Sequence, residues 1–206
     1  MTNQRPADAL PGVGRAVVKI LVAGGFGVGK TTLIRAVSEI TPLTTEEALT
    51  QASTPTDSLQ GVENKTTTTV ALDFGRITFD VPQPIEMFLF GTPGQSRFRP
   101  IWDDLASGAI GAVVLADTRR LETSFDAVTH FETRNIPFVV AVNEFEDDPE
   151  RYPADEIRHA LRLDDGVPVL TCDARRDRSA ARVLIALVDH ALSTRFAKTA
   201  ALDLHS

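Results

Sequence analysis

Eight consecutive residues near the start of the chain have the types and spacing that phosphate binding requires. The run Gly24-Gly25-Phe26-Gly27-Val28-Gly29-Lys30-Thr31 fits the pattern G-x-x-x-x-G-K-(S/T), and Thr32 follows it. Glycines let successive backbone N–H groups point inward around an anion, and a helix that starts here adds the positive end of its dipole. We expect Lys30 to reach the β and γ phosphates of a nucleotide, and the Thr31 hydroxyl to bind Mg²⁺.

A second glycine-containing segment follows the predicted strand 85–90. At Leu89-Phe90-Gly91-Thr92-Pro93-Gly94-Gln95 the chain resembles the Ras-like small GTPases. The resemblance implies that Gly94 meets the γ phosphate through its N–H group and that Gln95 orients the attacking water. Gly91 stands where that family has the switch II aspartate, which holds Mg²⁺ through water. Asp73 is the nearest acidic substitute.

The segment before the second predicted strand resembles switch I of the same family. Thr69 is the candidate for binding Mg²⁺ and the γ phosphate, and Thr68 is the second candidate. A polar, β-prone strand edge is the alternative interpretation of the four threonines 66–69. The catalytic residues that the resemblance implies are therefore Gln95, Lys30 and Thr69, and the metal ligands are Thr31 and Thr69.

Two later segments correspond to the guanine-binding motifs of Ras-like proteins. In Asn143-Glu144-Phe145-Glu146 the asparagine of N-K-x-D is kept, the lysine is lost, and Glu146 replaces the aspartate. Glu146, or the displaced Asp147, can accept hydrogen bonds from guanine N1–H and N2–H₂. Thr171-Cys172-Asp173-Ala174-Arg175 stands where the family has its S-A-K loop, and the N–H of Ala174 would contact guanine O6. A plain surface turn is the alternative for this loop.

The combination of these motifs resembles a narrower group, the bacterial Ras-like GTPases of actinobacterial conservon operons, which are relatives of the MglA polarity switches. The resemblance covers about residues 16 to 195. It implies two protein partners, a Roadblock/LC7-type protein and a membrane histidine-kinase-like protein. A lone cysteine favours a reducing cytosol, so we expect a cytoplasmic protein that its partners could recruit to the inner face of the membrane.

Phe26 departs from the Ras-like pattern, which keeps a small side chain beside the γ phosphate. A phenyl ring there is expected to crowd Gln95 and an arginine arriving from a partner, which would make hydrolysis slow. Packing of the ring against switch II is an equally good interpretation. Arg97 and Arg99, just beyond Gln95, are candidates for a cation supplied by the chain itself.

Apolar runs alternate with helical periodicity along most of the chain, which predicts an α/β fold. We expect a P-loop NTPase with a Ras-like G domain, in which a six-stranded, mostly parallel sheet is flanked by helices. The predicted strands are 16–23, 69–79, 85–90, 110–116, 137–142 and 167–171, and the second and third form an antiparallel hairpin. Apolar stripes predict helices after residue 30, over about 121–131 and over 183–192.

The predicted domain organisation is simple. Residues 1–14 form a disordered tail, residues 15–197 form the G domain, and residues 198–206 form a second tail. Within the domain, residues 41–67 are an extended switch I region without clear periodicity, too long for an idle connection.

Composition excludes several classes of function. A formal net charge of -7 argues against electrostatic capture of nucleic acid. Cys172 is the only cysteine, so an intrachain disulfide and a four-cysteine zinc site are both excluded. The apolar runs are too short for direct membrane insertion.

The sequence therefore predicts a guanine-nucleotide switch that binds GTP, hydrolyses it slowly with Mg²⁺, and signals through a partner. The alternative is a nucleotide-bound scaffold that does not hydrolyse GTP. A P-loop kinase is disfavoured because Gly94, Gln95 and Asn143 would have no role in it.

Overall fold

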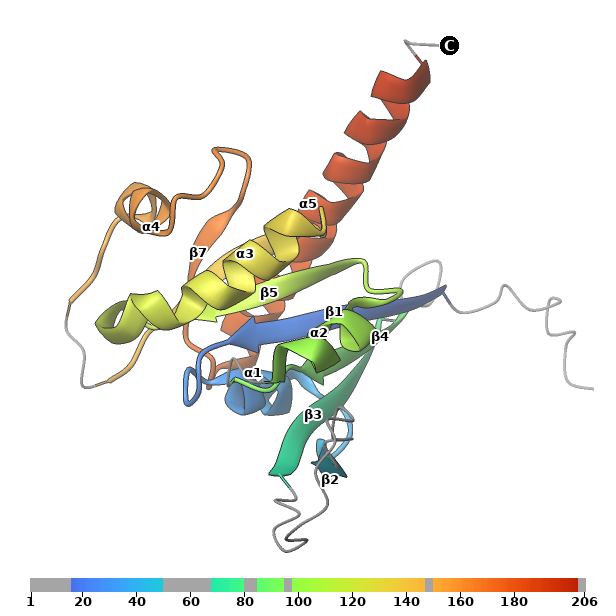
Figure 1. Cartoon of the computed structure of the whole chain (residues 1–206), viewed down its shortest axis with the longest axis vertical. Helices are drawn as coiled ribbons and strands as arrows, with labels where there is room; N and C mark the ends of the chain where they lie inside the picture. The colour runs from blue at the N-terminus through green and yellow to red at the C-terminus, as the bar shows by residue number, and fades with distance from the viewer. Residues whose placement is uncertain (1–15, 50–67, 80–84, 95–97, 147–149, 204–206) are drawn as a thin grey trace, which may run out of the picture.

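The structure, a computed structural model, describes residues 16–49, 68–79, 85–94, 98–146 and 150–203. Its centre is a seven-stranded sheet with the order β2-β3-β4-β1-β5-β6-β7, flanked by helices (Figure 1). The strands are β1 (Ala16–Gly24), β2 (Leu43–Leu49), β3 (Thr68–Phe79), β4 (Ile85–Gly91), β5 (Gly111–Ala116), β6 (Phe138–Asn143) and β7 (Val169–Cys172). The helices are α1 (Lys30–Val37), α2 (Arg99–Ala106), the 3₁₀ helix η2 (Thr118–Ser124), α3 (Phe125–Thr133), α4 (Ala154–Leu161) and α5 (Asp177–Asp203).

The sheet is mainly parallel, as the sequence predicts. β1 pairs in parallel with β4 and β5, and β6 and β7 continue the parallel run. β3 pairs antiparallel with β4, which confirms the predicted hairpin. The α/β architecture with a mostly parallel sheet between helices is therefore confirmed.

The sheet has one strand more than the six predicted. β2 lies inside segment 41–67, for which the sequence predicts a long loop, and it pairs antiparallel with β3 from Leu43 opposite Phe74 to Leu49 opposite Thr68. The open edge of β3 offers unpaired backbone groups, so a neighbouring segment can pair with it without an apolar alternation of its own. The rest of this segment, residues 50–67, lies outside the described residues, as does the predicted tail 1–14.

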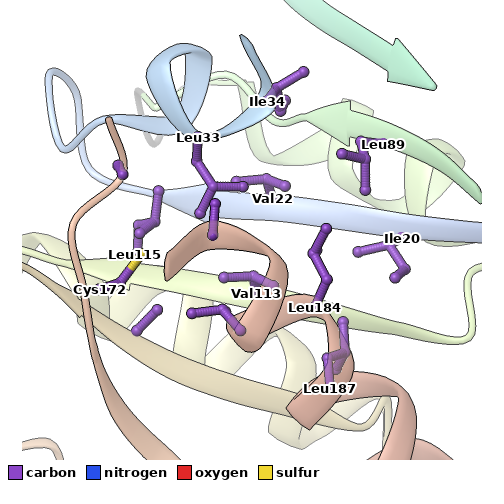
Figure 2. Packing of buried hydrophobic residues seen from close by; sticks show 14 of the residues in the cluster. Ile20, Val22, Leu33, Ile34, Leu89, Val113, Leu115, Cys172, Leu184 and Leu187 are labelled. Carbon is purple, nitrogen blue, oxygen red and sulfur yellow. The ribbon is translucent and has the colours of Figure 1, made fainter. Parts of the chain in front are cut away.

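Two apolar cores lie on opposite faces of the sheet. On one face, α1 and α5 pack on the strands, and Figure 2 shows Leu33 and Ile34 of α1 with Leu184 and Leu187 of α5 around β1. On the other face, the core contains Trp102 of α2 and apolar residues of α3 and α4. Each Å² of apolar surface buried in these cores contributes about 25 cal/mol to the stability of the fold, and this burial is the main force that holds the helices on the sheet.

The last helix is longer than predicted. α5 has 27 residues and continues to Asp203, so residues 198–203 extend the helix instead of starting a separate tail. This stretch contains alanine and leucine and has no glycine or proline to end the helix. Figure 1 shows α5 projecting beyond the sheet. Among the helices of the described residues, none has the length and apolar character that crossing a bilayer requires.

Candidate functional site

Five connections meet at one edge of the sheet, because the strands before them run parallel. They follow β1, β4, β5, β6 and β7. Ligands of parallel α/β sheets bind at the carboxyl ends of strands, where such connections converge. The candidate site is therefore assembled from segments that are far apart in the sequence.

The phosphate loop, residues 24–31, is held in shape by β6. Gly29 has a φ of 107°, in the left-handed region, and a Cβ built on it would lie 2.7 Å from Asn143 Nδ2. Asn143 Nδ2 donates to the Val28 carbonyl at 2.9 Å. Glycine at position 29 therefore permits both the turn and the close approach of the asparagine that fastens the loop.

Lys30 is the cation of this loop, and its side chain is partly buried. Lys30 Nζ donates to the carbonyl oxygens of Gly24 at 3.0 Å and Gly25 at 2.7 Å. Desolvation lowers the pKa of Lys30 to about 8, and the nearby charge of Asp73 opposes this shift. An anion beside the ammonium group would favour its charged form.

A carboxylate stands beside the loop although Gly91, at the end of β4, carries none. Thr31 Oγ1 donates to Asp73 Oδ2 at 2.5 Å, and Asp73 is only 9% exposed. Asp73 lies directly opposite Gly91 in the pairing of β3 with β4. A Cβ on Gly91 would lie 3.0 Å from Asp73 Cβ and 3.2 Å from Asp73 Oδ2. Because Gly91 has no side chain, the carboxylate from the neighbouring strand fits at this place.

The segment after β4 lies directly on the phosphate loop. A Cβ built on Gly94 would be 2.7 Å from Lys30 Nζ and 2.8 Å from the backbone nitrogen of Phe26. The same segment is tied to α2, since Trp102 Nε1 donates to the Pro93 carbonyl at 3.1 Å. A displacement of Gly94 would therefore reach α2.

Asn143 also connects the phosphate loop to the connection after β7. Its Oδ1 accepts the N–H of Ala174 at 3.0 Å. The next amide, that of Arg175, donates to Asp173 Oδ1 at 3.1 Å. The N–H groups of Ala174 and Arg175 are therefore both donated within the protein.

The carboxylates near the predicted base site are paired with an arginine. Arg175 donates to both oxygens of Asp173, at 2.9 and 3.1 Å, and its Nη1 lies 2.5 Å from Glu146 Oε1. The hydrogen bonds from Arg175 hold the pKa of Asp173 below its ordinary value, against the effect of desolvation. A cavity of 360 Å³ is lined by these residues together with Glu144, Phe145, Arg151, Arg176, Ser179 and Arg182.

Cys172 contributes its backbone to this region and its side chain to the core. The thiol is fully buried, and Figure 2 shows it among the apolar side chains. Desolvation raises its pKa to about 11. The Cys172 carbonyl accepts the N–H of Glu144 at 2.7 Å and so joins the two base-site connections.

A charged cluster that no motif in the sequence indicates lies at the start of η2. Asp117 is fully buried and accepts hydrogen bonds from the side chains of Arg119 and Arg120. Arg120 Nη2 also donates to the Phe26 carbonyl of the phosphate loop at 3.3 Å, and the Arg119 guanidinium lies 3.9 Å from the centre of the Phe145 ring. The signal that would have pointed to this cluster is an aspartate placed between an apolar strand and a helix.

The family model described as "Conserved hypothetical ATP binding protein" matches residues 22–194. The chain belongs to this family. A search of curated proteins found no match.

Among solved structures, this member of the conserved hypothetical ATP binding protein family is similar to the cytosolic domain of the T. maritima FeoB iron transporter. That pair has 19% identity and a TM-score of 0.60, and the match covers 85% of this chain and 64% of the other. The G domain of T. maritima FeoB has 19% identity and a TM-score of 0.59, with 85% and 99% covered. The FeoB G-domain from Methanococcus jannaschii has 16% identity and a TM-score of 0.57, with 85% and 98% covered. The predicted fold class, a P-loop G domain, is confirmed.

Phe26, in the phosphate loop of this family member, is 72% exposed. Extensive packing of the ring against the described part of switch II, one of the two predicted arrangements, is therefore not observed. Thr32, the last residue predicted at the loop, is also exposed, on α1.

Several predicted residues of this family member cannot be placed against the site. Gln95, Arg97 and Asp147 lie outside the described residues. Thr68 and Thr69 are in β3, but what their side chains contact is outside the description, as it is for Arg99 in α2.

Proposed function

We propose that this chain is a guanine-nucleotide-binding molecular switch that binds GTP and hydrolyses it slowly to GDP. One observation carries the proposal, namely that Gly94 lies against Lys30 and the backbone of the phosphate loop. A nucleotide with a third phosphate acts differently on a segment in that position than a nucleotide without one. A difference of this kind is what a switch needs.

The phosphates bind where the loop amides and Lys30 converge. Lys30 exchanges the carbonyls of Gly24 and Gly25 for phosphate oxygens. Phosphoryl transfer depends mostly on positioning and on stabilising charge, so these groups supply much of what hydrolysis requires. Gln95 orients the attacking water and Thr69 closes on the γ phosphate, and both roles rest on the resemblance to Ras-like proteins.

Mg²⁺ fits the residues at the base of this site. Thr31 and Asp73 place a hydroxyl and a carboxylate oxygen 2.5 Å apart beside the loop, and Mg²⁺ prefers hard oxygen ligands. Thr31 and Thr69 would hold the ion, with Asp73 in place of the carboxylate that Gly91 lacks. When bound, Mg²⁺ neutralises charge on the β and γ phosphates.

Guanine is the base that we propose, on the resemblance of residues 143–146 and of Ala174 to the guanine-binding motifs. To bind it, Ala174 must release Asn143, and Glu146 must release Arg175. The family description names ATP, and the engagement of both groups within the protein favours adenine as the second candidate. A base that does not need these groups leaves their hydrogen bonds intact.

A nucleotide-bound scaffold without hydrolysis is the alternative activity. The exposed ring of Phe26 favours it, because the resemblance to Ras-like proteins puts this residue beside the γ phosphate, where an arginine from a partner would enter. The Roadblock/LC7-type and histidine-kinase-like partners are proposals that rest on sequence resemblance alone. The cytoplasmic location and the recruitment to a membrane are proposals that rest on the sequence. A turnover assay with and without a Roadblock-type protein separates the switch from the scaffold.

The decisive experiment identifies the nucleotide that the protein retains. Purified protein is denatured and the released nucleotide is separated by chromatography. We expect GDP or GTP. Adenine nucleotide would overturn the assignment of guanine and support the second candidate, and a protein that neither retains nor binds any nucleotide would overturn the function.

A variant tests the phosphate loop directly. Lys30→Ala should weaken binding of GDP and GTP at least about tenfold, which corresponds to about 1.4 kcal/mol. Lys19→Ala is the matched control, because Lys19 Nζ donates to the Ser107 carbonyl at 2.9 Å and is not part of the loop. Unchanged affinity in Lys30→Ala with an intact fold would refute the assignment.

A further inference from the structure

We propose that Arg120 is a second cation of the phosphate site, supplied by the chain itself, and that it contacts the terminal phosphate of a bound nucleoside triphosphate. This inference rests on the proposed function and names a further residue of the same site. Arg120 lies in η2, after β5, outside every motif that the sequence indicates.

Arg120 stands at the rim of the phosphate loop. Its Nη2 donates to the Phe26 carbonyl at 3.3 Å and would lie 3.8 Å from a Cβ on Gly27. Both residues belong to the run whose amides surround the phosphates. An arginine side chain has several rotatable bonds, so its guanidinium can turn from a loop carbonyl to a phosphate oxygen while its backbone stays in place.

The backbone of Arg120 is fixed against the same loop. Its N–H donates to the Asp117 carbonyl at 3.0 Å, and its carbonyl accepts from Thr123 Oγ1 at 2.8 Å. Thr123 in turn touches the loop, since a Cβ on Gly25 would lie 2.4 Å from its Oγ1. Because its backbone is fixed beside the phosphate loop, the guanidinium of Arg120 needs only a change of side-chain rotamer to reach a phosphate bound there.

Arg119 and Arg120 both bind the carboxylate of Asp117, and Arg120 makes fewer and longer hydrogen bonds to it than Arg119 does. Arg119 binds both carboxylate oxygens, at 2.9 and 3.0 Å, whereas Arg120 makes one contact at 3.3 Å. Strong N⁺–H···O⁻ bonds measure about 2.7–2.9 Å, so Arg119 already satisfies most of what the carboxylate can accept. One aspartate faces two arginines, which leaves one positive charge for an anion. The Arg120 side chain is 47% exposed, and its Nε and Nη1 make no hydrogen bond to any residue of the described ranges.

The position of Gly94 indicates which phosphate Arg120 reaches. Gly94 approaches the backbone nitrogen of Phe26, and Arg120 binds the carbonyl of the same residue. A Cβ on Gly94 would also lie 2.7 Å from Lys30 Nζ, so Gly94, Lys30 and the residue that Arg120 binds meet at one place. The phosphate that meets Gly94 is therefore the one that lies beside Arg120.

Binding measurements on three variants test this inference without requiring turnover. The variants are Arg120→Ala, Arg120→Lys and the control Arg195→Ala, whose residue lies on the projecting half of α5, about 27 Å along the helix from Asp177. Affinities are measured for GDP, for GDP with aluminium fluoride, and for a non-hydrolysable GTP analogue. Thermal unfolding of each variant checks its fold.

Arg120→Ala should weaken binding of the GTP analogue and of the fluoroaluminate complex at least about tenfold, and binding of GDP less than about threefold. Arg120→Lys should recover part of the loss, and Arg195→Ala should match the parent. Equal losses for GDP and the analogue would mean that Arg120 only shapes the loop and would overturn the inference, as would no loss at all.

Failure of the proposed function has a different signature. A parent protein that binds adenine nucleotides instead of guanine nucleotides overturns the assignment of guanine, and the same variants with ADP and an ATP analogue then decide the role of Arg120. A parent that binds neither pair overturns both proposals.

Discussion

Single residues of the candidate site are joined by hydrogen bonds across long stretches of chain. Thr31 and Asp73 are 42 positions apart, and Asn143 and Val28 are 115 positions apart. The role of each of these groups depends on the hydrogen-bond partner that the fold places beside it. Substitution of one partner tests the contact directly.

Asp73→Ala should lower the affinity of the nucleotide complex for Mg²⁺ by about tenfold, because it removes the carboxylate beside Thr31. The measurement is GDP dissociation followed during a titration with Mg²⁺. Asp155→Ala is the control, since the side chain of Asp155 on α4 is 97% exposed. A midpoint for Mg²⁺ equal to that of the parent would contradict a role for Asp73.

Asp117 should stabilise the fold in a pH-dependent manner. Burial opposes its ionisation, but hydrogen bonds from Arg119 and Arg120 outweigh this effect and hold the pKa of Asp117 below its ordinary value of 3.8. A carboxyl with a depressed pKa contributes its full stability above the ordinary pKa and loses it as the pH falls through the folded-state value.

Urea unfolding of the parent and of Asp117→Asn checks this prediction. The difference in free energy of unfolding should be constant between about pH 5 and pH 7 and should shrink below about pH 4. A difference that stays the same down to pH 3 would show that the charge of Asp117 is not what stabilises the fold.

The sequence predicts the phosphate loop because all of its residues are contiguous, and a local pattern contains everything that the loop needs. Asp73 could be named only as the nearest acidic residue, because its role depends on the register between β3 and β4. The sequence does not predict the position of Arg120 either, because this position also depends on the fold. Its partner Phe26 is 94 positions away in the chain. The hydrogen bonds of Lys30 to the loop carbonyls and of the Ala174 N–H to Asn143 likewise form only in the folded chain, so the sequence does not reveal them.

At the level of elements, two helices were not predicted although their signals are local. α2 carries Pro100 in its first turn. α4 follows Pro153 and has acidic residues in its first turn and basic residues in its last. Both have only eight residues and few apolar ones, so each offers too few turns for its periodicity to be recognised with certainty. β2 could not be predicted, because its pairing with β3 is what makes it a strand.

Trp102 gives α2 a natural reporter, since it is the only tryptophan of the chain. It is 2% exposed, donates to the Pro93 carbonyl, and meets His130 of α3 edge-on with ring centroids 5.2 Å apart. Replacement of GDP by a non-hydrolysable GTP analogue should shift its emission to longer wavelength, because displacement of Gly94 strains the bond to Pro93 and admits water.

Fluorescence spectra of the two nucleotide complexes are the measurement, and Trp102→Phe should remove the signal. Identical emission in both complexes would show that α2 does not follow the segment after β4. The switch would then have to act through other segments.

For the whole molecule, nucleotide binding and folding are coupled because the site joins connections from five strands. A ligand that binds only the folded state stabilises it by an amount that grows with ligand concentration. Cys172 allows this to be followed, since it is the only cysteine, is fully buried, and has its pKa raised to about 11 by desolvation.

A thiol reagent should therefore react with Cys172 only when the protein opens. GDP at 100 times its Kd should slow the reaction about 100-fold, and ADP should slow it less. Urea-unfolded protein, which should react at once in either nucleotide, is the control. Equal protection by GDP and ADP would contradict a preference for guanine.

Positions 73 and 91 lie opposite each other and together hold one carboxylate, so the residue types that the two positions accept are coupled. A chain with aspartate at both positions would bring two like charges together, and a Cβ on Gly91 would already lie 3.0 Å from Asp73 Cβ. A chain with glycine at both has no carboxylate there. An exchange of the acid between the two strands therefore requires a paired substitution, Asp73→Gly together with Gly91→Asp, and neither single substitution replaces it.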